Sequence, residues 1–169
     1  MTLAPSNQAA ENPQTAEAAR LNTPEILLNA NREAREKDLA FAGTVSPEEA
    51  WELFKNGDAY LVDVRTAEER KFVGHVSNTL HIAWQTGPAL IKNPRFLREL
   101  ENKVSSKSAP ILLLCRSGKR SAAAATAATA AGFTQVYNVR EGFEGDLDDN
   151  QQRGRISGWR QRGLPWVQD

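Results

Sequence analysis

The single cysteine of this 169-residue chain, Cys115, begins a short run of cationic and small residues. The residues that follow it in this run are Arg116, Ser117, Gly118, Lys119, Arg120 and Ser121. A thiol among three cationic side chains favours two kinds of chemistry, which are formation of a nucleophilic thiolate and binding of a small anion. This run is therefore the candidate catalytic site.

The elements expected on either side of Cys115 would place it well for that chemistry. Residues 110–114 are apolar and predict a buried strand, whereas residues 121–131 include eight alanines and predict a helix. Sites in parallel sheets gather at the carboxyl ends of strands, and a helix N-terminus offers unpaired N–H groups to an anion. Gly118 permits a curl that would turn several loop N–H groups toward one point. We therefore expect a thiolate nucleophile beside an oxyanion cradle.

A buried cysteine without a catalytic role is the alternative, because free cysteine commonly behaves as a small apolar residue. Three cations, one glycine and two serines in the six residues after Cys115 do not suit a purely apolar site. The sequence therefore favours a functional thiol.

The composition excludes several other classes of function. The 21 basic and 21 acidic side chains cancel, so no excess positive charge indicates a nucleic-acid or membrane-surface partner. One cysteine allows no internal disulfide, and with two histidines it gives no credible zinc site. Residues 145–150 are similar to a calcium loop, but Gln151 and Ser157 stand where such a loop needs glycine and glutamate. We expect neither a metal nor another cofactor.

The N-terminal residues and the hydropathy predict a cytoplasmic protein. Residues 1–20 have neither the basic start nor the apolar run of a secretory signal. No stretch of about 18 apolar residues indicates a membrane span. A reducing compartment is also the simplest setting for a free functional thiol.

Short strands alternate with helices along the chain, which favours an α/β fold. Strands are predicted at residues 59–64, 80–82, 110–114 and 135–139. Helices are predicted at residues 24–40, 47–55, 66–71, 93–102, 121–131 and 158–162. We expect a small, open, mainly parallel β-sheet flanked by helices on both faces, with an N-terminal helical extension.

Three segments are expected along the chain. Residues 1–22 are polar, alanine-rich and interrupted by proline, so they are predicted to be mobile. Residues 23–43 form the helical extension, in which Thr23 caps the helix and Pro24 takes its first position. This extension either packs on the outside of the domain or serves as an arm that binds a partner or a second copy. Residues 44–169 form the domain that carries the cysteine.

Several further motifs stand at characteristic spacings between about residue 44 and residue 167. They are Leu61-Val62-Asp63-Val64-Arg65 with Glu69, Gly74-His75-Val76, Leu80-His81-Ile82, Ile111 to Ser121, Gly158-Trp159 and Gly163-Leu164-Pro165. In this order and spacing they resemble the rhodanese superfamily. The resemblance implies a single rhodanese-like domain with thiosulfate sulfurtransferase activity.

The resemblance also implies a mechanism. Cys115 would take the outer sulfur of thiosulfate, or of a similar anionic donor, as a persulfide. The N–H groups of residues 116–121 would stabilise that persulfide, and their cationic side chains would attract the donor. Cyanide, a small thiol or a protein thiol would then accept the sulfur.

Loop length separates this hypothesis from the related cysteine phosphatases and arsenate reductases. Their pattern places an arginine six residues after the cysteine, where its guanidinium grips a phosphoryl group. Here that position is Ser121, and Arg120 comes one residue early, which fits a sulfur atom better. A persulfide carrier or binding module with little turnover stays open as another alternative.

The resemblance assigns Asp63 and Arg65 a structural role, as an ion pair that orders the first strand and the loops near it. His75 and His81 lie in turn and strand segments of the resemblance. We therefore expect both histidines to be structural residues rather than general bases.

The sequence departs from the family pattern after Glu141-Gly142. An aromatic segment usually follows there closely, but here residues 143–157 intervene before Gly158-Trp159. This insertion is a candidate for shaping access to Cys115 or for binding a partner.

Overall fold

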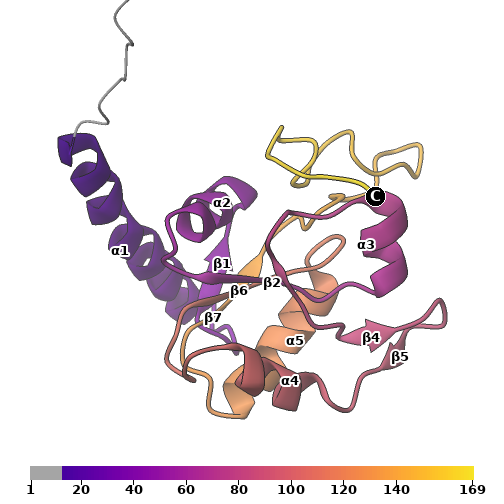
Figure 1. The fold of residues 1–169 in the computed structure, drawn as a ribbon, viewed down its shortest axis with the longest axis horizontal. Coiled ribbons are helices and arrows are strands. Elements are labelled where there is room, and N and C mark those ends of the chain that lie inside the picture. Colours follow the sequence, from indigo (N-terminus) through magenta and orange to yellow (C-terminus); the bar gives the residue numbers. More distant parts are fainter. Residues whose placement is uncertain (1–12) are drawn as a thin grey trace, which may run out of the picture.

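A parallel sheet of five strands forms the centre of the molecule, and the computed structural model in Figure 1 describes residues 13–169, with side chains from Glu25 onward. The strand order is β1-β7-β6-β2-β3, and every neighbouring pair is parallel. These strands are β1 (Gly43–Val45), β7 (Val136–Val139), β6 (Ile111–Leu114), β2 (Tyr60–Asp63) and β3 (Leu80–His81). A separate antiparallel pair consists of β4 (Gln85–Thr86) and β5 (Ile91–Lys92).

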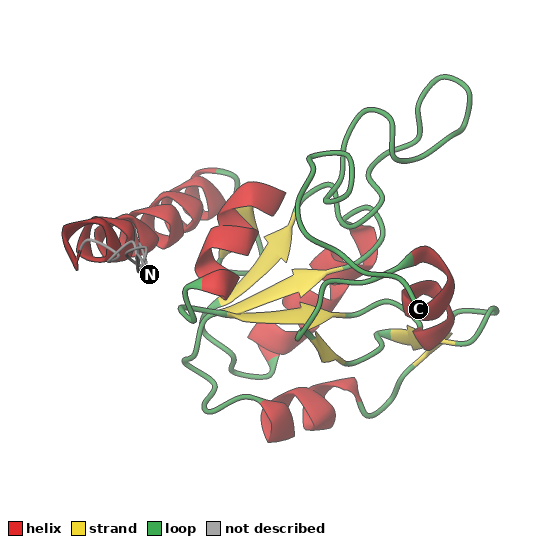
Figure 2. Ribbon diagram, turned by 45° about the horizontal axis from the view of Figure 1, so that its top comes forward, coloured by secondary structure: helices red, strands yellow, loops and turns green. Residues whose placement is uncertain are grey.

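Helices cover both faces of the sheet (Figure 2). They are α1 (Pro13–Glu36), α2 (Pro47–Lys55), α3 (Ala67–Val73), α4 (Phe96–Lys103) and α5 (Lys119–Ala130). Buried side chains of α1 and α2 pack on one face, and those of α4 and α5 pack on the other. The predicted α/β fold, with a mainly parallel sheet flanked by helices, is confirmed.

The central strand β6 anchors the residue that follows it. Because successive side chains of a strand point to opposite faces, Ile111 and Leu113 pack on the side of α4 and α5. Leu112 and Leu114 pack on the side of α1 and α2. All four side chains are completely buried, and each contributes about 1.5–3 kcal/mol of hydrophobic stabilisation. The next residue, Cys115, lies in the cluster on the α5 side.

Small side chains let α5 approach the sheet closely. Ala124, Ala125 and Ala128 are completely buried and lie in the same cluster as Leu113 and Cys115. The N-terminus of α5 is thereby held close to the carboxyl end of β6.

Helix α2 has the predicted bounds because its N-terminal signal is purely local. The Ser46 side chain accepts a hydrogen bond from Glu49 N–H, and the Glu49 side chain accepts one from Ser46 N–H. Such a capping box satisfies backbone donors that have no partner inside the helix. Ala50 and Leu53 are then fully buried against the sheet.

The first helix differs from the prediction at both ends. It begins at Pro13 rather than Pro24, and it ends at Glu36 rather than at residue 40. The alanine, glutamate, arginine and leucine residues that separate the two prolines favour helix, and proline is well tolerated at a first helical position. Asp38 has a φ of 52°, a left-handed conformation that cannot continue the helix.

The expected boundary at Thr23 is therefore not a helix start. Residues 1–12 of the segment predicted to be mobile lie outside the described residues, whereas residues 13–22 belong to α1. The division of the chain into an extension and a domain stays a prediction.

Strand β1 was not predicted, and its position depends on a contact with α1. A Cβ atom on Gly43 would lie 2.6 Å from the carbonyl oxygen of Ala30, so only glycine permits this approach. The sequence of β1 is too short to reveal a strand by its own pattern.

Two other helices differ in extent, and a third predicted helix is absent from the described residues. Helix α3 ends at Val73, beyond the single turn expected at residues 66–71. Helix α4 begins at Phe96 rather than directly at Asn93-Pro94. The helix expected at residues 158–162 is replaced by turns.

Candidate active site

Cys115 follows β6 directly, at the carboxyl edge of the parallel sheet. The residue is only 1% exposed, so its sulfur lies beneath the surface. Its Sγ accepts a hydrogen bond from Gly118 N–H at 3.1 Å and lies 3.1 Å from the hydroxyl oxygen of Ser121. Two polar groups therefore contact the sulfur from the loop and from α5.

The loop after Cys115 is shorter than predicted, because α5 begins at Lys119 rather than Ser121. Gly118 is the N-cap and has a φ of 96°, a conformation that glycine adopts without strain. Lys119, Arg120 and Ser121 consequently form the first helical turn, whose N–H groups have no partner inside the helix. An anion beside the sulfur would meet these donors and the positive end of the helix dipole.

A second segment, which contains Gly142 and Phe143, holds this loop from its other side. The carbonyl oxygen of Cys115 accepts a hydrogen bond from Phe143 N–H at 2.8 Å, and that of Arg116 accepts one from Glu144 N–H at 2.9 Å. A Cβ atom on Gly142 would lie 2.5 Å from the Cys115 carbonyl oxygen, so glycine is needed here. Each peptide unit is planar and trans, so its N–H points opposite to its carbonyl oxygen. The N–H groups that belong to the same peptide units as these two carbonyls therefore point away from this segment.

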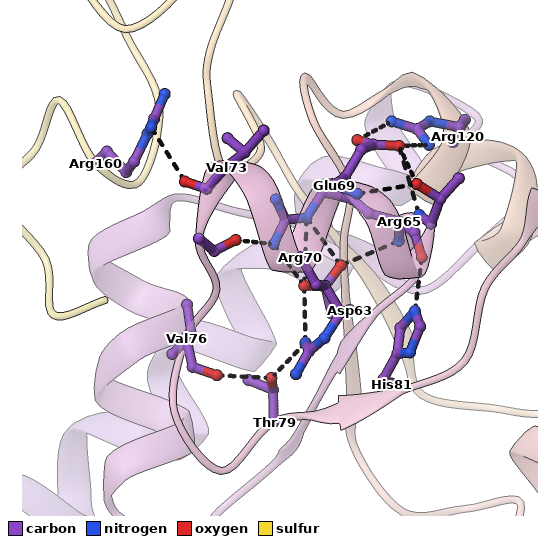
Figure 3. Close-up of polar contacts among 12 residues, drawn as sticks. Asp63, Arg65, Glu69, Arg70, Val73, Val76, Thr79, His81, Arg120 and Arg160 are labelled. Atoms are coloured by element: carbon purple, nitrogen blue, oxygen red, sulfur yellow. Dashed lines mark hydrogen bonds and ion pairs between the residues drawn. The ribbon is translucent and has the colours of Figure 1, made fainter. Parts of the chain in front are cut away.

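Arg120, which was expected to attract an anionic donor, is paired with Glu69 of α3 (Figure 3). Its Nη1 and Nη2 donate to the two carboxylate oxygens at 2.7 and 2.8 Å. Burial acts to raise the pKa of Glu69, but the hydrogen bonds and charge of Arg120 lead the effects that outweigh it, so this pKa lies below its usual value. The charge of Arg120 is thereby largely neutralised, and the pair links α3 to the first turn of α5.

The remaining positive charge of the loop comes from Arg116 and Lys119. Both residues are exposed. Within the described part of the chain, neither takes part in an ion pair. These two cations are therefore available to draw an anion toward the loop.

Asp63 and Arg65 form a buried ion pair at the end of β2 (Figure 3). Both side chains are 0% exposed, and Nη2 of Arg65 lies 2.7 Å from Oδ2 of Asp63. Burial acts to raise the pKa of Asp63, but the charges and hydrogen bonds of Arg65, with the charge of Arg70, hold it below its usual value. Arg65 also lies over the ring of Phe143, with 4.2 Å between Cζ and the ring centroid. The pair thus touches the segment that holds the loop, and its structural role stays a prediction.

Asn138 of β7 joins the site although sequence reasoning did not select it. Its Oδ1 lies 2.6 Å from Oγ of Ser121, and its Nδ2 donates to the carbonyl oxygen of Gly118 at 3.1 Å. The signal was an asparagine between Tyr137 and Val139, within a strand of which every residue is buried. Such a buried polar side chain requires hydrogen-bond partners.

The two histidines are engaged by the backbone. Nε2 of His81 lies 2.8 Å from the carbonyl oxygen of Arg65 (Figure 3). The backbone of His75 pairs with that of Val167, which brings the C-terminal segment beside the end of α3 (Figure 1). The His81 contact agrees with the structural role expected for it. Among the described residues Nδ1 of His75 is buried without a hydrogen-bond partner, so the role expected for His75 stays a prediction.

The two ends of the insertion after Gly142 meet at Gly145 and Gly158. A Cβ atom on Gly158 would lie 2.5 Å from the backbone nitrogen of Gly145, so the two glycines touch. Beyond this contact, Trp159 N–H donates to the Gly142 carbonyl oxygen at 2.9 Å, and its side chain is completely buried. The chain therefore returns to Gly142 where the insertion ends, and Trp159 packs into the core there.

Among the described residues, no three histidine, cysteine, aspartate or glutamate side chains gather closely enough to hold a metal ion. Within the same part of the chain, no helix has the length and apolar character that crossing a membrane would need.

Comparison with known proteins gives consistent relatives. The sequence matches the family described as Rhodanese-like domain over residues 46–148. An uncharacterized protein of Rickettsia rickettsii is 40% identical over 119 residues, which cover 68% of this chain and 87% of that protein. Thiosulfate sulfurtransferase GlpE of Actinobacillus pleuropneumoniae serotype 5b (strain L20) is 28% identical over 121 residues, which cover 72% of this chain and 89% of that protein. The crystal structure of Rv0390 from M. tuberculosis has 43% sequence identity and a TM-score of 0.69, and the match covers 76% of this chain and 99% of that one.

Proposed function

Because the chain belongs to the rhodanese-like domain family, we propose that it is a sulfurtransferase. Cys115 carries a sulfane sulfur from thiosulfate, or a similar anionic donor, to a thiophilic acceptor such as cyanide or a thiol. The two 3.1 Å contacts to its Sγ, from Gly118 N–H and the Ser121 hydroxyl, support this proposal most directly. The relative named thiosulfate sulfurtransferase adds support for the same reaction.

The first half-reaction is a displacement at sulfur. The Cys115 thiolate attacks the outer sulfur of thiosulfate and forms a new S–S bond, while the original S–S bond breaks and sulfite leaves with its electron pair. The products, a persulfide anion and a sulfite dianion, carry the same total charge as the thiolate and thiosulfate. In the second half-reaction the acceptor attacks the outer sulfur of the persulfide, and the Cys115 thiolate is released.

The loop supplies what this reaction needs. The N–H groups of residues 116–121 and the dipole of α5 stabilise the terminal sulfur of the persulfide. Arg116 and Lys119 attract the dianionic donor to the loop. Arg120 adds less to this attraction than first expected, since its charge is paired with Glu69.

Phosphoryl and arsenate chemistry has weaker support. Such chemistry needs a guanidinium fork directed at the bound oxyanion. Ser121 occupies the position where that arginine is required. The neighbouring Arg120 already uses its fork on Glu69.

Replacement of the nucleophile tests the proposal. Cys115→Ser is expected to abolish thiocyanate formation from thiosulfate and cyanide, because a serine hydroxyl neither ionises readily nor forms a persulfide. Circular dichroism should stay that of the wild type. Thr126→Ala, at an exposed position of α5, is the matched control and should keep full activity. Wild-type turnover in the serine variant would refute the proposal.

Intact-mass measurement separates the alternatives. After thiosulfate treatment the wild-type protein should gain the mass of one sulfur, and Cys115→Ser should gain none. A persulfide that forms but does not turn over would indicate a sulfur carrier, and an unchanged mass would indicate a binding module. Hydrolysis of an aryl phosphate that depends on Cys115 would indicate a phosphatase. A reducing compartment such as the cytoplasm suits the proposed chemistry, because it keeps the thiol free.

A further inference from the structure

Cys115 and three other residues form a closed ring that is linked by four hydrogen-bond contacts. Gly118 N–H donates to Sγ at 3.1 Å, and the Gly118 carbonyl oxygen accepts from Nδ2 of Asn138 at 3.1 Å. Oδ1 of Asn138 lies 2.6 Å from Oγ of Ser121, which in turn lies 3.1 Å from Sγ. Cys115, Ser121 and Asn138 are 1%, 0% and 8% exposed, so water does not compete freely for these contacts.

The orientation of the Asn138 amide follows from its partners. The Gly118 carbonyl oxygen can only accept, so the amide atom that faces it must be the donor Nδ2. Oδ1 therefore faces Ser121, and two oxygens at 2.6 Å must share a proton. Ser121 has a single hydroxyl proton, and it can donate to Oδ1 of Asn138 at 2.6 Å or to Sγ of Cys115 at 3.1 Å, of which the contact to Asn138 is the shorter.

Counting protons gives different results for the two forms of the sulfur. When Cys115 is a thiol, its S–H can donate to Ser121 while the Ser121 hydroxyl donates to Asn138, so every contact is satisfied. When Cys115 is a thiolate, it can only accept, and both it and Asn138 then require the one hydroxyl proton. One contact must be lost on ionisation.

We propose that Asn138 is a positioning residue that competes with the Cys115 thiolate for the Ser121 hydroxyl proton and so favours the persulfide over the free thiolate. The second part of this inference rests on the proposed sulfurtransferase function. In the persulfide the inner sulfur, Sγ, is uncharged, and the negative charge lies on the outer sulfur. Sγ is then only a weak hydrogen-bond acceptor, so the Ser121 hydroxyl can keep its hydrogen bond to Asn138. Asn138 thus destabilises the free Cys115 thiolate without destabilising the persulfide.

Other charges near the sulfur stay fixed when Asn138 is changed. The charged side chains of the loop and of the first turn of α5 are Arg116, Lys119 and Arg120, of which Arg120 pairs with Glu69 of α3 and also interacts with Asp63. Arg140 and Glu141, which follow β7, pass close to Gly118. Asn138 makes its side-chain hydrogen bonds to Ser121 and Gly118 instead. The Gly118 carbonyl oxygen also accepts from Ala122 N–H, at 3.3 Å, so it keeps a partner when the amide is removed.

Titration of the thiolate by its ultraviolet absorbance tests the inference, and the signal is unambiguous because the chain has one cysteine. Asn138→Leu keeps the volume but removes the acceptor, so the thiolate fraction at a given pH below the midpoint should rise about tenfold, the scale of one hydrogen bond to a charged group. Alkylation by iodoacetamide should rise about threefold, since a more stable thiolate is less nucleophilic. Asn138→Ala, which cannot overpack, should shift the curve in the same direction.

Combining Asn138→Leu with substitutions of Ser121 tests whether the effect acts through the Ser121 hydroxyl. In Ser121→Ala the substitution Asn138→Leu should shift the thiolate curve by less than about twofold, because no hydroxyl proton remains to be released. In Ser121→Thr, which keeps a hydroxyl, the shift should persist. A shift of the opposite sign, no shift, or an equal shift in the Ser121→Ala background would overturn the inference, since each indicates a structural role for Asn138 alone.

The loaded state provides a separate readout. At a fixed ratio of thiosulfate to sulfite, and where the thiolate predominates, Asn138→Leu should lower the ratio of persulfide to free protein in intact-mass spectra up to about tenfold. An unchanged ratio would overturn the bias toward the persulfide. If the wild-type protein forms no persulfide at all, the proposed function fails, whereas the thiolate titration still tests the competition for the proton.

Discussion

Asp63→Asn is expected to destabilise the protein strongly, because it leaves a buried guanidinium without its counter-charge. The Asp63 carboxylate accepts hydrogen bonds from Arg65 N–H, Nε and Nη2 and from Arg70 Nη1. The Asp63 and Arg65 side chains are 0% exposed, so neither can turn to solvent. Asparagine keeps the shape but lacks the charge, and its amide NH₂ group would face the N–H donors of the two arginines, which it cannot accept from.

The expected loss is about 3–5 kcal/mol of the free energy of unfolding, the usual cost of removing one partner of a buried ion pair. Arg70 adds little to this figure, because its side chain is 18% exposed and can be solvated. Native domains are stable by only about 5–15 kcal/mol. The substitution should therefore remove a large fraction of the total stability.

Urea unfolding followed by tryptophan fluorescence measures this loss. The midpoint should fall while the slope m stays constant, because the surface exposed on unfolding is unchanged. Glu101→Gln is the matched control, since Glu101 pairs with Lys107 at 3.8 Å on the surface, and its midpoint should not move measurably. A loss below about 1 kcal/mol for Asp63→Asn would refute this reasoning, because it would mean that other groups stabilise the buried charge of Arg65.

Acid unfolding gives the same substitution a second readout. The pKa of Asp63 in the folded state lies below the ordinary value of 3.8. Its ionisation therefore contributes stability that is complete above the unfolded-state pKa and is lost as the pH falls through the folded-state pKa. Asp63→Asn should flatten the dependence of stability on pH below about pH 4. An unchanged slope in that range would contradict the assigned direction of the shift.

Two further substitutions test the site. Glu69→Gln removes a negative charge and releases Arg120, so KM for thiosulfate should fall about two- to fivefold, whereas a rise in steady-state KM would show that the pair is needed to hold α5. Gly142→Ala places a Cβ atom against the loop and forces alanine to a φ of 66°, so activity should fall at least about tenfold. Gly57→Ala, at a φ of 74° with open space around it, should keep full activity and so separates the clash from the strain.

Local signals predicted the elements that define the fold. The capping box of Ser46 and Glu49 set the start of α2, and the apolar run at residues 110–114 identified β6. Both signals act within a few residues of the chain, so the sequence displays them directly. Strand β1 has only three residues and exists through its pairing with β7 and its contact with α1. Nothing local in its sequence distinguishes it from a loop.

The candidate site was predictable where it is contiguous. Residues 115–121 could be selected by type and spacing, but the partner that neutralises Arg120 is Glu69, far away in the sequence. The same limit applies to Phe143, which holds the Cys115 carbonyl oxygen through a long-range backbone hydrogen bond. Charge on a loop therefore predicts an anion site only after the partners of each cation are known.

Asn138 marks a residue type that the sequence could have revealed. A run such as Val136 to Val139 in a doubly covered parallel sheet is expected to be apolar throughout. A polar side chain there costs free energy unless it forms hydrogen bonds, so its presence indicates a group nearby that needs a donor or an acceptor. The carboxyl edge of the sheet, where Cys115 and the start of α5 meet, is where such groups gather. The asparagine was thus an independent indication of polar groups at this edge, which the structure shows to be the Ser121 hydroxyl and the Gly118 carbonyl oxygen.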